Sequence, residues 1–114
     1  MNIRRIGPGA WNSRIAVWNG MAFLSGIVAD DKTQDTKGQT EQVLRTIDAL
    51  LAEAGSDKSR ILSATVYLAD IGNKDAMNEA WTAWMDKANP PARAAIGVTL
   101  TPGTQVEIMM CAAL

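Results

Sequence analysis

Two side chains near the C-terminal end of the chain, Arg93 and Glu107, have the chemistry of a small-molecule site. Arg93 follows the double proline Pro90-Pro91, at the start of an expected strand of small residues. Its planar guanidinium carries a fork of donors that matches a carboxylate or a phosphate. Glu107 lies near the middle of the last expected strand, where a carboxylate could orient a water. The pair predicts a small anionic substrate and a hydrolytic or proton-transfer step.

The residue types that are missing narrow this chemistry. The chain has one cysteine, Cys111, and no histidine. A Cys/His zinc site, a disulfide within these residues and a histidine-based triad are therefore excluded. Cys111 is typical of a small buried hydrophobe, because no histidine is present to activate it as a nucleophile. We predict a reaction that uses no metal and no cofactor.

The composition indicates one globular domain spanning residues 1–114. Apolar residues make up 47%, charged residues 20%, and the net charge is −1. This balance argues against a broad nucleic-acid footprint, which needs clustered positive charge. We find no signal-peptide pattern at the start and no window near the ~20 apolar residues of a membrane span. We therefore expect a cytoplasmic protein without nucleic-acid or membrane partners.

Hydrophobic periodicity and turn signals predict an α+β domain with the order β-β-α-β-α-β-β. Strands are expected at residues 14–18, 21–25, 60–69, 92–98 and 105–113, with room for a short strand at 3–5. The pair Asn19-Gly20 predicts a two-residue hairpin turn, and the segment 27–35 reads as a loop. A first helix should begin at Asp35 or Thr36 and end at Gly55. A second helix should run from Asn73 to about Ala88, before Pro90.

Two helices can cover only one face of such a sheet. The last strand nevertheless has apolar residues on both faces, with Met109, Cys111 and Ala113 on the side of Glu107. That second side needs helices or another subunit to cover it, and a homo-oligomer is the simplest solution. Trp81 and Trp84, three positions apart in the second helix, are expected in the core.

Several motifs together resemble the RidA/YjgF family of reactive-intermediate enamine/imine deaminases, long labelled endoribonuclease L-PSP. They are Ile6-Gly7-Pro8-Gly9, Leu24-Ser25-Gly26, Met77-Asn78-Glu79-Ala80-Trp81, Pro91-Ala92-Arg93-Ala94-Ala95 and Val106-Glu107-Ile108. The resemblance covers nearly the whole chain. It implies a chorismate-mutase-like α+β fold and a homotrimer with sites in clefts between subunits. It also implies hydrolysis of 2-aminoacrylate, through 2-iminopropanoate, to a 2-oxo acid and ammonia.

The same resemblance implies roles for individual residues. Arg93 would bind the substrate carboxylate, and Glu107 would contact the ligand or a catalytic water. The cleft would be lined by Ser25, Gly26, Asn78, the backbone of Ala95 and, as a wall, Trp11. Structural interpretations stay open beside these: an ion pair across the subunit contact for Arg93 or Glu107, a hairpin end for Ser25, and a helix-surface hydrogen bond for Asn78.

The chain also departs from the family pattern around the expected pocket. Trp11 stands near the position of a tyrosine, Ala95 replaces a cysteine, Gly97 a glutamate and Ile27 a glutamine. These changes indicate a divergent branch, with substrate choice altered more than chemistry. An alternative function is therefore a noncatalytic trimer that binds and reports small carboxylates. RNA cleavage follows only from the old family label, and the acidic balance and lack of histidine argue against it.

Overall fold

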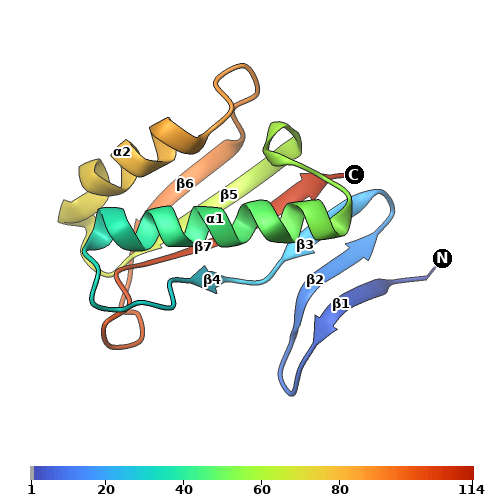
Figure 1. Cartoon of the computed structure of the whole chain (residues 1–114), viewed down its shortest axis with the longest axis horizontal. Coiled ribbons are helices and arrows are strands. Elements are labelled where there is room, and N and C mark those ends of the chain that lie inside the picture. Colours follow the sequence, from blue (N-terminus) through green and yellow to red (C-terminus); the bar gives the residue numbers. More distant parts are fainter. Residues whose placement is uncertain (1) are drawn as a thin grey trace.

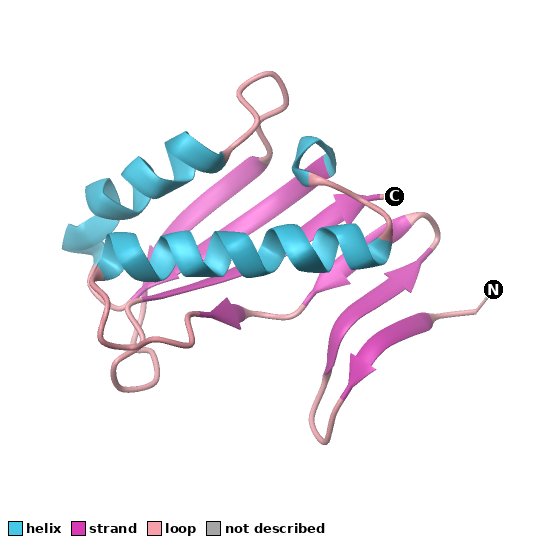
Figure 2. Ribbon diagram, viewed as in Figure 1, coloured by secondary structure: helices cyan, strands magenta, loops and turns pink. Residues whose placement is uncertain are grey.

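The computed structural model describes residues 2–114 as one α+β domain, a mixed sheet covered by two helices (Figures 1 and 2). The strands are β1 (Arg4–Pro8), β2 (Ser13–Trp18), β3 (Met21–Leu24), β4 (Ile27–Val28), β5 (Ile61–Leu68), β6 (Ala92–Gly97) and β7 (Val106–Ala113). The α-helices are α1 (Thr36–Ala54) and α2 (Lys74–Trp84), and two short 3-10 helices are η1 (Lys58–Arg60) and η2 (Ile71–Asn73). The predicted fold class and helix number are confirmed.

The sheet has the strand order β1-β2-β3-β7-β5-β6, with β4 pairing with β7 beside β3. Only β5 and β6 are parallel, because α2 connects them as a crossover. The other pairs are antiparallel. The strands β1 and β6 therefore form the two edges, and β7 lies in the interior of the sheet.

Local signals set the boundaries of the first half. Asn19 and Gly20 both have positive φ, as the predicted two-residue turn requires. Asp35 caps α1, because its side chain accepts a hydrogen bond of 2.8 Å from the Gly38 amide. Gly55 ends the helix in the left-handed conformation, with φ of 89°.

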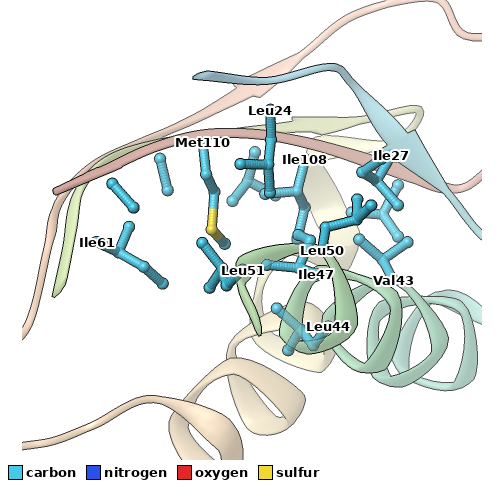
Figure 3. Packing of buried hydrophobic residues seen from close by; sticks show 14 of the residues in the cluster. Leu24, Ile27, Val43, Leu44, Ile47, Leu50, Leu51, Ile61, Ile108 and Met110 are labelled. Atoms are coloured by element: carbon cyan, nitrogen blue, oxygen red, sulfur yellow. The ribbon is translucent and has the colours of Figure 1, made fainter. Parts of the chain in front are cut away.

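Both helices lie on the same face of the sheet, with α1 crossing β7 and α2 running beside β6 (Figure 1). The core forms between this face and α1, where side chains of the two layers point toward each other (Figure 3). Ile47 and Val43 of α1 and Ile108 of β7 are fully buried there. None of the helices in residues 2–114 is long and apolar enough to cross a membrane.

Two predicted boundaries were wrong. Segment 27–35 is not entirely a loop, because Ile27–Val28 forms β4 on β7 and buries Ile27 in the core. The second helix ends at Trp84 rather than near Ala88. Its end has a local cause: the carboxylate of Asp86 accepts from the Ala88 amide, 3.0 Å away, and this turn competes with further helix.

The face of the sheet opposite the helices is uncovered within this chain. Its large apolar side chains are between 38% and 48% exposed. They are Trp18, Phe23, Val28, Ile96 and Met109. The last four share this face with their partners Cys111, Glu107, Tyr67 and Thr65, and Trp18 pairs with Met21, the partner of Ala113. This open face is the apolar second side that the sequence of the last strand predicted.

Candidate active site

Arg93 lies on the helix-covered face, at the edge of the sheet. Arg93 pairs with Ala64, and Ala64 pairs with Met110, which is buried on the helix-covered face. Residues directly opposite each other in neighbouring strands share one face, so Arg93 lies on that face too. The side chain is half-buried under α2. The guanidinium carbon lies 4.9 Å from the centre of the Trp81 ring, and Nη1 is 3.7 Å from the sulfur of Met77. The arginine is therefore held between an edge strand and one helix.

No carboxylate in residues 2–114 lies within ion-pair distance of Arg93. Its one protein hydrogen-bond acceptor among these residues is the thioether of Met77, a weak acceptor. Burial lowers the pKa of the Arg93 guanidinium from its ordinary value, although an arginine stays charged at neutral pH. A partly desolvated cation without an anionic partner is a candidate anion-binding group, and no carboxylate within residues 2–114 fills that role.

Ala95 lies two residues farther along β6, half-buried against the same core. Since β6 is an edge strand, it leaves one row of N–H and C=O groups unpaired. These groups are available to a ligand or to a second chain. The neighbouring Gly97 is covered by Ile71 of η2, because a Cβ added at Gly97 would lie 3.1 Å from the Ile71 Cβ.

Glu107 lies on the other face, where it pairs with Tyr67 of β5 and Val28 of β4. The side chain is half-buried and reaches Gly26. A Cβ added at Gly26 would clash with Oε2 of Glu107, so only glycine permits this approach. The structure thus brings Glu107 and Gly26 together.

Ser25 and Gly26 line a shallow hollow on the open face. Its other lining residues are Arg5, Asn12, Ser13, Ala16, Phe23, Leu24 and Met109. The Ser25 amide donates to the carbonyl of Arg14, 2.9 Å away, which agrees with its interpretation as a hairpin end. Arg5 was missed as a site residue, and its only sequence signal was the adjacent pair Arg4-Arg5.

Arg93 and Glu107 do not meet within one chain. Glu107 pairs with Tyr67 of β5, Tyr67 pairs with Ile96 of β6, and Arg93 lies three residues before Ile96. Strand spacing and rise place the α-carbons of Arg93 and Glu107 roughly 10 Å apart across the sheet and roughly 10 Å apart along it. Their side chains point to opposite faces. We therefore call the surroundings of each residue a candidate half-site.

Two other predicted residues join neither half-site. Asn78 follows Met77 in α2 but lines a shallow groove with Lys37 and Glu79. Trp11 lies in the connection between β1 and β2 and is 96% exposed, so it walls no pocket of its own chain. Trp81 was assigned only to the core, and its contact with Arg93 had no local signal.

Comparisons with known proteins agree with this fold. The family model described as Endoribonuclease L-PSP matches residues 3–114. A RutC family protein of Haemophilus ducreyi is 47% identical over 103 residues, covering 90% of this chain and 88% of that protein. The RutC family protein YoaB of Escherichia coli is 38% identical over 115 residues, covering 100% of both.

A crystal structure of a YjgF-family protein from Neisseria meningitidis superposes with a TM-score of 0.96. It is 40% identical in sequence, and the match covers 99% of this chain and 95% of that one. The fold is thus that of the YjgF class of α+β domains. The chain belongs to the RutC/YjgF family, also described as Endoribonuclease L-PSP.

Proposed function

We propose that this protein hydrolyses small reactive 2-imino acids, of the 2-iminopropanoate type, to 2-oxo acids and ammonia. Arg93 grips the substrate carboxylate, and Glu107 positions the attacking water. The sites lie between subunits of a homotrimer. The observation that carries the proposal is the half-buried guanidinium of Arg93, which has no carboxylate partner in residues 2–114. Family membership supports the proposal only at the level of the family, because the matching names do not give imine hydrolysis and the description Endoribonuclease L-PSP prints a different activity.

The division of the site supports the oligomer. The half-site of Arg93 is on an open sheet edge, and that of Glu107 and Gly26 is on an open apolar face. A rotationally symmetric assembly in which the β6 edge of one protomer meets the open face of the next completes one site at each contact. It also buries the apolar side chains of that face, such as Phe23 and Met109, away from water.

The proposed reaction is balanced without a cofactor. Water adds to C2 of the imine, and Glu107 takes one proton from that water and passes it to the nitrogen. In the resulting carbinolamine, the hydroxyl proton is passed to the nitrogen in the same way, so that the C–N bond breaks, a C=O bond forms and ammonia leaves. Arg93 contributes by fixing the carboxylate so that the reacting carbon faces the water. The imine carbon is already electrophilic, so little further activation is required.

The test is release of 2-oxo acid from 2-aminoacrylate that is generated enzymatically in the assay. The wild-type protein should accelerate pyruvate formation, and Arg93→Ala should lower kcat/KM by at least about 100-fold through loss of orientation. Arg60→Ala is the matched control, because Arg60 is an exposed arginine in η1. Wild-type protein that is no faster than buffer would refute the activity on this substrate.

A second candidate is a noncatalytic binder of small carboxylates. Two departures from the family pattern favour this candidate: Ala95 stands in place of a cysteine and Gly97 in place of a glutamate. The space that a side chain at position 97 would need is filled by Ile71. This candidate predicts that pyruvate raises the melting temperature of the wild-type protein and not that of Arg93→Ala, with no turnover of 2-aminoacrylate in the same preparation.

A further inference from the structure

We propose that Trp81 is the positioning residue for Arg93: its indole forms a rigid floor that fixes the guanidinium and leaves N–H donors of the guanidinium accessible to an anion. This inference rests on the proposed function in one respect, that Arg93 is the anion anchor. The ligand class it implies is a small anion, such as a carboxylate, that binds these donors.

The contact has the geometry of a cation–π interaction. The Arg93 guanidinium carbon lies 4.9 Å from the centre of the Trp81 ring, inside the roughly 6 Å over which such attraction acts. Arginine otherwise samples many rotamers, and holding it on a ring removes that freedom before the ligand arrives. The gain should therefore appear in ligand affinity.

Trp81 is itself immobilised by a chain of contacts that reaches α1. Its side chain is 5% exposed, and its ring packs at 56° on the ring of Trp84, with the centroids 5.7 Å apart. The indole nitrogen of Trp84 donates to Oδ2 of Asp48, 2.8 Å away. The floor beneath Arg93 is thus anchored through α2 to the helix that forms the core.

Met77 completes the arrangement. Its sulfur accepts a weak hydrogen bond from Nη1 of Arg93, 3.7 Å away, which a carboxylate oxygen readily replaces. The guanidinium carbon lies over the Trp81 ring, so a ligand has to approach from another side. A carboxylate that approaches in the guanidinium plane accepts two parallel hydrogen bonds, which is the geometry the fork prefers.

The experiment compares Trp81→Leu and Trp81→Phe with Ile47→Val in the assembled protein. Ile47→Val is the matched control, because it perturbs a fully buried core side chain of α1 that is not among the contacts of Arg93. Loss of the ring in Trp81→Leu should raise the dissociation constant for pyruvate and the KM by about tenfold while kcat changes less than about twofold. The Phe variant keeps a weaker ring and should lose about threefold.

A second measurement needs no ligand. In the free protein, ¹⁵N relaxation of the Arg93 Nε–H group should report an ordered side chain in the wild type and in Ile47→Val, and a mobile one in Trp81→Leu. If Trp81→Leu does not fold, the Phe variant carries the same comparison with a smaller change. If Trp81 only stabilised the fold, its replacement would lower the melting temperature. The order of the Arg93 side chain would stay the same, and KM would not rise separately from a change in kcat.

The outcomes separate the two proposals. Wild-type protein that neither binds pyruvate nor turns over substrate overturns the proposed function, while an ordered Arg93 that Trp81→Leu mobilises still supports the positioning role. A folded Trp81 variant with equally ordered Arg93 and unchanged pyruvate affinity overturns the positioning role.

Discussion

The two faces of the sheet have opposite environments although they are built from the same strands. On the helix-covered face, Ile108 and Met110 of β7 are buried against α1. On the open face of the same strand, Met109 is 48% exposed and Glu107 approaches Gly26. The covered face holds the fold together, whereas the open face leaves apolar side chains accessible to other molecules. Arg93 lies between these environments, on the covered side but at the β6 edge.

The sharpest test of this comparison uses one residue type on both faces. Ile47→Ala removes a fully buried side chain and should destabilise the protein by about 2–5 kcal/mol. Ile96→Ala changes an isoleucine that is 44% exposed on the open face, and its cost should stay below about 1 kcal/mol in the isolated protomer. Urea unfolding curves measure both. Equal losses would contradict the assignment of the core to one face.

The next prediction concerns Gly26 and addresses chemistry rather than stability. Gly26→Ala would push the carboxylate of Glu107 aside, because a Cβ there clashes with Oε2. Turnover of 2-aminoacrylate should fall by about 100-fold, the usual cost of misplacing a reacting group. Because the obstructing atom is the end of a flexible side chain, the melting temperature should change little. Full activity in a folded Gly26→Ala protein would remove Glu107 from the proposed mechanism.

Association should depend on the open face. Met109→Ala removes an exposed thioether from its centre and should weaken self-association by about tenfold. Sedimentation velocity over a concentration series would follow the change. The protomer itself should remain folded, because this side chain packs little within its own chain. An unchanged association constant would argue that copies meet through another surface.

The smallest expected effect is in the reactivity of Cys111. Burial raises the pKa of its thiol, so less thiolate is present at neutral pH than in an ordinary cysteine. Its reaction with a disulfide reagent should therefore be slow at pH 7 and accelerate as the pH rises through and beyond the usual thiol range. Cys111 also lies on the open face, beside Phe23. Because Met109→Ala should favour free protomers, in which this face is accessible, it should speed the reaction. Fast labelling at pH 7 would contradict the raised pKa.

Much of the fold was predictable from local signals, as three positions illustrate. Asn19-Gly20 specified a turn with positive φ, Asp35 a helix cap and Gly55 a left-handed end, and the structure has all three. The end of α2 was missed because the Asp86 turn intervenes before Pro90. β4 was missed because two residues, Ile27 and Val28, are too few for a periodic pattern.

The sequence by itself determined the strand alternation, the helix boundaries of α1 and the absence of histidine chemistry, because each depends on residue types or on neighbours a few positions apart. Only the tertiary structure decided that Arg93 and Glu107 face opposite ways and that Trp81 lies under the guanidinium. The physical reason is register: alternation tells which residues of one strand share a face, but long-range pairing decides how the faces of different strands match.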